Sequence, residues 1–153
     1  MSTKDELKLI KFGKESSDPL LSGVNKLADA VAVTMGPMGM NVIIETLQGH
    51  PIVTKDGVTV AKSVRVRDSS ENLGIDVVRE AASRTADTAG DGTTTATVLA
   101  RAIFSEGLKM IAAGYAPRDI ISGVRESSKD VICFISKTSR PVKDSGEIMS
   151  VAT

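Results

Sequence analysis

Apolar residues recur at helical spacing along most of this chain, and this periodicity constrains the fold more than any other feature. One helix is predicted from residue 17 to 35, and others over about residues 70–89, from 91 or 93 to 114, over 117–140, and from 144 onward. Leu73 and Val77 mark one face of the helix at 70–89, and Leu99 and Ile103 are apolar positions of the helix that starts at 91 or 93. The clearest stripe, from residue 17 to Met35, consists of Leu20, Leu21, Val24, Leu27, Ala28, Val31 and Met35.

Two short β-branched runs interrupt the helical pattern. Residues 41–45 and 51–54 are separated by a four-residue turn, which predicts a small hairpin. For residues 58–66 the pattern fixes no element type, extended or mixed. Aromatic residues make up only 3% of the chain and Trp is absent, so the core must consist of aliphatic side chains and Met. The predicted fold class is mainly α with a small β element.

Charge and cysteine content exclude several classes of function. Lys plus Arg and Asp plus Glu both number 19, so no net charge favours nucleic acid or an anionic membrane. No apolar run approaches the ~20 residues that span a bilayer. The single cysteine, Cys133, excludes an internal disulfide framework or a cysteine zinc cluster and fits a cytoplasmic protein. On its helix, Cys133 is predicted to be a buried, inert thiol.

The most unusual stretch is an acid between two glycines, followed by hydroxyl residues where a helix begins. Helix amino termini favour phosphate, glycines let the backbone approach an anion, and hydroxyls add donors without charge. Asp91 would repel a bare phosphate but could hold a Mg²⁺ that bridges phosphate oxygens. The alternative is that Asp91 or Thr93 only caps the helix. The stretch comprises Gly90, Asp91, Gly92, Thr93, Thr94 and Thr95.

Two other turns could face the same ligand. Residues 34–37 (TMGP) follow the first helix, and residues 54–57 (TKDG) follow the hairpin. Lys55 could pair with a phosphate, and Asp56 could orient water or metal, which are roles that phosphoryl transfer requires. The alternative for the second turn is an ordinary solvated β-turn. Neither a Walker pattern nor a G-x-G-x-x-G pattern is present, so an ATP site here would not be a P-loop.

These three turns, in this order, resemble the N-terminal part of a group I, GroEL-type chaperonin subunit. The resemblance extends from KFG at residues 11–13 to EGLK at 106–109 and AAG at 112–114. It implies an ATP-dependent folding machine that forms a homo-oligomeric ring. Residues 1–138 would be the first part of the ATP-binding equatorial domain, a helical bundle with a β-hairpin, and residues 139–153 the start of the intermediate domain.

The resemblance also implies roles for individual residues. Asp91 would coordinate Mg²⁺, Lys55 would lie near the phosphates, and Asp56 would assist hydrolysis of ATP. The remaining nucleotide contacts would come from Thr34, Met35, Gly36, Pro37, Gly92, Thr93, Thr94 and Thr95. Met38 and Met40 replace the Lys and Arg of the group I pattern, which puts ion pairs between subunits in doubt.

Partners follow from the same resemblance. Residues 9–12 (LIKF) and the hairpin at 41–54 would pair with ring neighbours, because an exposed strand edge favours such pairing. Unfolded clients would bind a domain that is not in this chain, and a co-chaperonin is a further expected partner. The family's adenine contacts and water-activating aspartate lie later than residue 153, so this segment alone is expected to be inactive. If 153 residues are the complete chain, the alternative is a non-catalytic adaptor that joins or caps rings.

Overall fold

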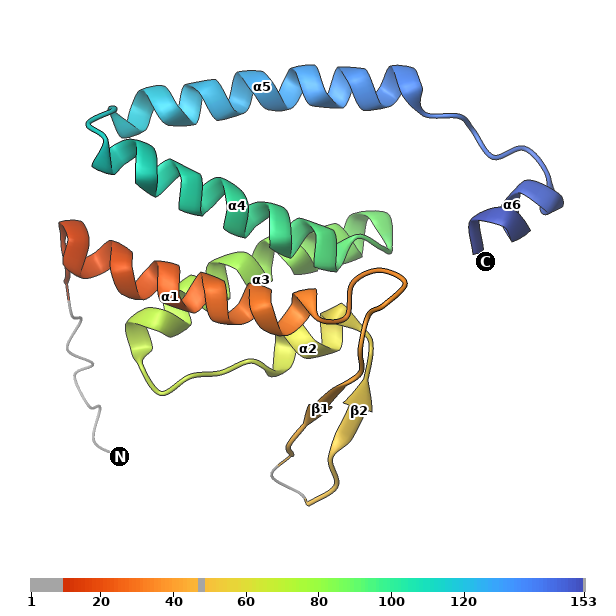
Figure 1. The fold of residues 1–153 in the computed structure, drawn as a ribbon, viewed down its shortest axis with the longest axis horizontal. Helices are drawn as coiled ribbons and strands as arrows, with labels where there is room; N and C mark the ends of the chain where they lie inside the picture. Colours follow the sequence, from red (N-terminus) through yellow and green to blue (C-terminus); the bar gives the residue numbers. More distant parts are fainter. Residues whose placement is uncertain (1–9, 47–48, 153) are drawn as a thin grey trace, which may run out of the picture. The chain divides into compact units, whose positions relative to one another are not determined.

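The computed structural model describes residues 10–46 and 49–152. It confirms the predicted class, because helices dominate and the strands form a two-stranded antiparallel sheet (Figure 1). The elements are α1 (Gly13–Ala32), β1 (Val42–Ile44), β2 (Ile52–Thr54), α2 (Gly57–Ser63), α3 (Ser69–Ala89), α4 (Thr93–Ala112), α5 (Pro117–Thr138) and α6 (Ser145–Ala152). The stretch that the sequence left open, residues 58–66, begins with helix α2. The chain divides into two compact units, residues 1–109 and 110–153.

Helices α1 and α3 cross at two glycines. A Cβ on Gly23 would lie 1.9 Å from the carbonyl oxygen of Glu71, and a Cβ on Gly74 would lie 2.2 Å from that of Leu20. Each helix therefore presents a glycine to the backbone of the other, and no larger residue fits at this crossing. An ion pair between Lys26 and Glu71, 2.6 Å apart, joins the same two helices.

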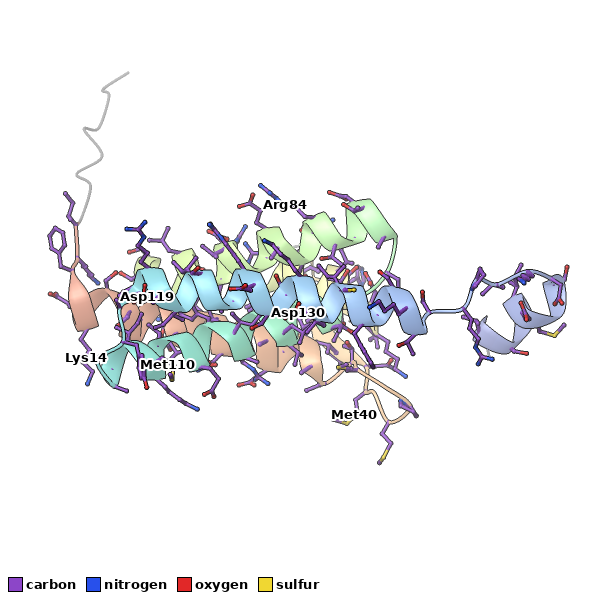
Figure 2. The ribbon with its side chains drawn as sticks, turned by 90° about the horizontal axis from the view of Figure 1, so that it is seen from above. Lys14, Met40, Arg84, Met110, Asp119 and Asp130 are labelled. Carbon is purple, nitrogen blue, oxygen red and sulfur yellow. The ribbon has the colours of Figure 1, made fainter. Side chains whose placement is uncertain are left out.

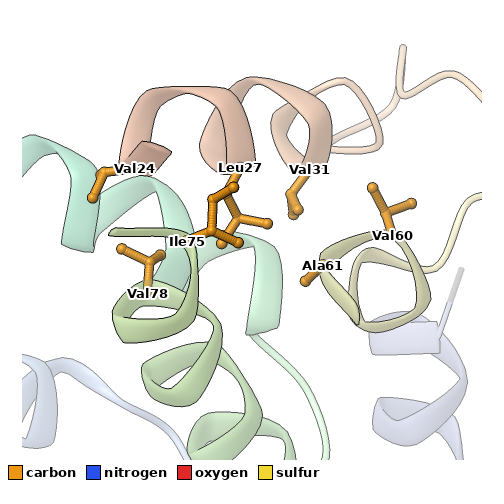
Figure 3. Close-up of a cluster of buried hydrophobic side chains, with 7 residues drawn as sticks. All are labelled: Val24, Leu27, Val31, Val60, Ala61, Ile75 and Val78. Atoms are coloured by element: carbon orange, nitrogen blue, oxygen red, sulfur yellow. The ribbon is translucent and has the colours of Figure 1, made fainter. Parts of the chain in front are cut away.

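The core of the first unit lies between α1, α2 and α3 (Figure 3). Leu27, Val31 and Ile75 are fully buried at its centre. Burial of aliphatic side chains contributes about 1.5 to 3 kcal/mol each, so this cluster accounts for much of the stability of the unit. The buried cluster consists of Val24, Leu27, Val31, Val60, Ala61, Ile75 and Val78.

The hairpin extends from the helices at the carboxyl end of α1 (Figure 1). Its register pairs Val42 with Thr54 and Ile44 with Ile52. Residues 10–12 form no strand within the single chain, since a strand needs a neighbour to pair with, and Leu9 lies outside the described residues. The pairing of residues 9–12 and 41–54 with other subunits stays a prediction.

Parts of the apolar stripes on two helices are not buried. On α3, Leu73 and Val77 are exposed, because the buried face of the helix carries Gly74, Ile75 and Val78 instead. On α4, Leu99 and Ile103 are about half exposed, whereas Thr97 is fully buried. Val77 of α3 and Ile103 of α4 line an apolar groove of about 340 Å³. Its lining comprises Leu20, Val24, Gly74, Val77, Val78, Ala81, Ala100, Ile103 and Phe104.

The second unit contains α5 and α6. Helix α5 begins with Pro117 in its first turn and ends before Pro141, as predicted, but none of its residues is buried. Cys133 is exposed, so the prediction of a buried thiol is wrong. Its side chain lies on a helix whose apolar residues are largely exposed, as Ile132 is at 63%. None of the helices in the described part of the chain is long and apolar enough to cross a membrane.

Candidate functional site

Asp56 caps the amino terminus of α2. Its Oδ1 accepts a hydrogen bond from the Val58 backbone at 3.1 Å, and its Oδ2 accepts bonds from the backbone and hydroxyl of Thr59 at 2.9 and 2.6 Å. The Thr59 hydroxyl and backbone bonds hold the pKa of Asp56 below its ordinary value, with smaller contributions from Val58 and the Lys62 charge. The predicted acid is therefore an exposed, ionised carboxylate in a fixed position.

The turn that carries Asp56 meets the start of α4 through Gly57. A Cβ on Gly57 would lie 2.3 Å from the hydroxyl oxygen of Thr94 and 3.4 Å from a methyl group of Val31. Only a glycine lets the two turns approach this closely. The second and third predicted turns are thus in direct contact.

The first turn meets the second through Gly39 and Lys55. A Cβ on Gly39 would lie 3.0 Å from Cε of Lys55 and 2.3 Å from the carbonyl oxygen of Thr34. Backbone bonds from Gly39 to Gly36, 3.0 Å, and from Met40 to Val33, 2.7 Å, fold the loop back on the end of α1. All three predicted turns therefore lie at one end of the first unit.

This loop also explains where α1 ends. The helix stops at Ala32, three residues before the predicted Met35, because the next amides bond only three residues back. Thr34 is buried, and its hydroxyl donates to the carbonyl of Val31 at 2.7 Å. Met35 is half exposed, and Gly36 and Pro37 are exposed. In the same loop Met38 is 92% exposed and Met40 63%, and Met40 is labelled in Figure 2.

The third turn has two glycines in left-handed conformations. Gly90 ends α3 with φ of 74°, as predicted, and Gly92 has φ of 84°. Oδ1 of the exposed Asp91 accepts a hydrogen bond from the Gly92 backbone at 2.6 Å. This bond fixes the carboxylate beside the amino terminus of α4, while the side chain stays open to solvent.

The threonines of the third turn divide into two groups. Thr93 and Thr97 are buried, and the Thr97 hydroxyl donates to the Thr93 carbonyl at 2.8 Å. Thr94 is half-buried against Gly57, and Thr95 is exposed. A ligand at this turn therefore has Thr94 and Thr95 hydroxyls within reach, whereas Thr93 offers only backbone in this conformation.

The donor set fits a phosphate with Mg²⁺. Mg²⁺ is typically held by one or two carboxylates together with phosphate oxygens and water. Asp91 and Asp56 are exposed carboxylates on two turns in contact, and Lys55 adds a cation. Within the described residues, His, Cys, Asp and Glu side chains form no cluster of three or more that could hold a metal ion.

Two residues that bring the turns together were not identified from the sequence. Gly39 and Gly57 look like ordinary turn glycines, and nothing in their neighbours indicates that each makes room for a distant segment. Neither glycine has a left-handed φ, so the backbone conformation of a turn does not explain why glycine stands at these two positions.

Residues 27–153 match the model of the TCP-1/cpn60 chaperonin family. The chain belongs to the TCP-1/cpn60 chaperonin family. The matched range contains all three turns, and it confirms the resemblance drawn from their residues. Membership supports a chaperone role, and chaperonins as a family bind ATP with Mg²⁺. Assignment to the group I branch and the domain boundary at residues 138 and 139 stay predictions.

Proposed function

We propose that this chaperonin chain is part of an ATP-dependent folding machine and binds the phosphates of Mg-ATP where its three turns meet. The observation that carries the proposal is the contact of Gly57 with Thr94 together with that of Gly39 with Lys55. These contacts join residues that are 37 and 16 positions apart in the sequence, and so bring the three turns to one place, as a shared ligand requires.

Each group has a distinct role in this proposal. Asp91 holds Mg²⁺, and the cation neutralises charge on the phosphate oxygens when it is bound. Lys55 pairs with a phosphate, Thr94 and Thr95 donate hydroxyls, and the amino terminus of α4 adds backbone donors. Asp56 assists hydrolysis as an ionised carboxylate close to the terminal phosphate.

The loop of residues 34–37 is a further part of the proposed site. The Thr34 hydroxyl donates to Val31 and the Gly36 carbonyl accepts from the Gly39 amide, so these bonds hold the loop in one conformation. Met35 and Pro37 supply apolar contact. We further propose that the protein acts in a cytoplasmic ring, in which the hairpin and residues 9–12 pair with neighbours, clients bind elsewhere and a co-chaperonin is a partner.

The proposal is tested by Mg-ATP binding and turnover in the assembled protein. Asp91→Asn removes the charge that holds Mg²⁺ and is expected to weaken Mg-ATP binding about tenfold or more, which is about 1.4 kcal/mol. Asp56→Asn keeps a good helix cap and is expected to leave binding in place while turnover falls about 100-fold. Asp87→Asn, an exposed acid on the last turn of α3, is the matched control.

The outcomes separate the alternatives. Equal Mg-ATP affinity in the Asp91→Asn and Asp87→Asn proteins would refute the metal role of Asp91. Stable association with an intact chaperonin ring, without any turnover of ATP, would favour the non-catalytic adaptor instead.

A further inference from the structure

Arg79 of α3 makes an unusual set of contacts with the end of α2. Its Nε donates to the carbonyl of Ala61 at 2.8 Å, and one terminal nitrogen donates to the carbonyl of Val64 at 2.5 Å. The other terminal nitrogen pairs with Asp76 on its own helix. The side chain is only 13% exposed, so the guanidinium is largely removed from water.

The bonded carbonyls are those that a helix end leaves without partners. The last four carbonyls of a helix have no intrahelical donor, and a cation there also complements the helix dipole. Ala61 lies in the last turn of α2, and Val64 is the residue that follows the helix. Arg79 therefore caps the carboxyl end of α2 from another helix.

The opposite end of α2 is capped by Asp56. The helix has seven residues, about 10 Å at 1.5 Å per residue, and is too short to be stable alone. Its two ends are held by an anion at the amino terminus and a cation at the carboxyl terminus. A helix this short unwinds when either cap is lost, and unwinding would release the Val58 and Thr59 donors from the Asp56 carboxylate.

We propose that Arg79 is a positioning residue of the candidate site: by holding the carboxyl end of α2 against α3, it fixes the helix and the Asp56 turn at its other end. The inference rests on the proposed function only in that Asp56 is taken to assist hydrolysis of ATP. Buried Val60 and Ala61 also hold α2, but apolar packing supplies no donor to the carbonyls at the carboxyl end of the helix. The guanidinium fork fixes the position because two carbonyls accept from it in one geometry.

The test is a pH titration of the carboxyl carbons by NMR, without nucleotide, in the full chain and in Arg79→Lys and Arg79→Gln. The two variants lose one and both arms of the fork. The Asp56 midpoint is expected to rise toward its ordinary value in Arg79→Gln, and by a smaller amount in Arg79→Lys. Arg84→Gln, on the exposed side of α3 (Figure 2), is expected to leave it unchanged.

Asp68 is the internal reference. It caps α3 as Asp56 caps α2, and the Glu71 backbone bond lowers its pKa. A rise at Asp56 alone supports positioning, whereas a rise at both carboxyls in both Arg79 variants means general loss of structure and overturns the proposal. An unchanged Asp56 midpoint in Arg79→Gln overturns it as well. Failure of the chain to bind Mg-ATP would refute the proposed function and leave this result standing.

Discussion

The hydroxyl oxygen of Thr94 lies 2.3 Å from the point that a Cβ on Gly57 would occupy. This single contact joins the first turn of α2 to the first turn of α4. It places the helix capped by Asp56 beside the turn that holds Asp91, although the two acids are 35 positions apart in the sequence. The candidate site depends on the absence of a side chain at Gly57.

Substitution of Gly57 by Ala is expected to force the Thr94 side chain out of its present position. Overpacking of this kind costs about 1 to 3 kcal/mol. We therefore expect Gly57→Ala to lower the free energy of unfolding, measured by urea denaturation. The double variant Gly57→Ala with Thr94→Ala removes the hydroxyl that clashes, and recovery of at least about 0.5 kcal/mol relative to additivity is expected.

Gly107→Ala is the matched control for this experiment. A Cβ at Gly107 meets nothing within 4 Å, and the residue lies inside α4. Ala at an unstrained helical position is better than Gly by about 0.5 to 1 kcal/mol, so this variant is expected to be more stable. Equal effects of Gly57→Ala and Gly107→Ala would show that the contact with Thr94 does not exist.

Gly74→Ala is expected to be more damaging than Gly57→Ala. The new Cβ would lie 2.2 Å from the carbonyl oxygen of Leu20, which is backbone and cannot rotate away. Helices α1 and α3 must then separate and expose part of the core around Ile75. The expected loss is about 3 kcal/mol, at the upper end of the overpacking range, and thermal unfolding followed by circular dichroism measures it. If Gly74→Ala does not lower the unfolding midpoint relative to Gly107→Ala, the close approach of helices α1 and α3 at Gly74 is contradicted.

Much of this fold could be predicted from periodicity, because α1, α3, α4, α5 and α6 each carry apolar positions at helical spacing. Helix α2 could not, since its Val-Thr-Val sequence favours a strand, and the Asp56 cap and burial of Val60 decide otherwise. The roles of Gly23 and Gly74 could not be predicted either. Glycines within a helical stripe give no sign of the backbone that they contact.

The positions of the three turns were predicted better than the packing around them. Turn residues such as Asp56, Asp91 and Lys55 can be identified from the sequence, because their charge and the glycines beside them are local features. The contacts that bring them together depend on Gly39, Gly57 and segments distant in the chain. Cys133 shows the same limit, because its burial was predicted from its place on an apolar helix, and none of the residues of that helix is buried.

The cap at Asp56 predicts a specific dependence of stability on pH. Its hydrogen bonds hold the pKa in the folded chain below 3.8, so the ionised cap stabilises the fold fully above that pH. The stabilisation is lost as the pH falls below 3.8 and through the folded-state pKa. At pH 7 Asp56→Ala is expected to lower the free energy of unfolding by about 0.5 to 2 kcal/mol.

Urea unfolding of the Asp56→Ala and unmodified proteins at pH 7 and near pH 2 measures this difference. The gap between the two proteins is expected to shrink at the lower pH. Asp87→Ala, which removes an exposed acid, is expected to change stability little at either pH. A gap that stays constant over this range would contradict the cap.

Lys55 is expected to affect ligand binding without affecting stability. Its side chain is exposed, and no ion pair holds it in the described structure. Lys55→Gln should weaken binding of Mg-tripolyphosphate by about tenfold and leave the unfolding midpoint unchanged. Lys62→Gln, an exposed cation in the last turn of α2, is the control and should bind as the unmodified protein does. Isothermal titration calorimetry of both variants makes the comparison.

The most direct test is a map of backbone amide chemical shifts as Mg-ATP is added to the protein. We expect amides at residues 34–40, 55–59 and 91–95 to shift together along one binding curve, since they surround one ligand. Mg-tripolyphosphate should shift the same amides, because the proposed contacts are with phosphates. Absence of shifts at millimolar Mg-ATP, or shifts at only one of the three turns, would contradict the claim that the turns form one site.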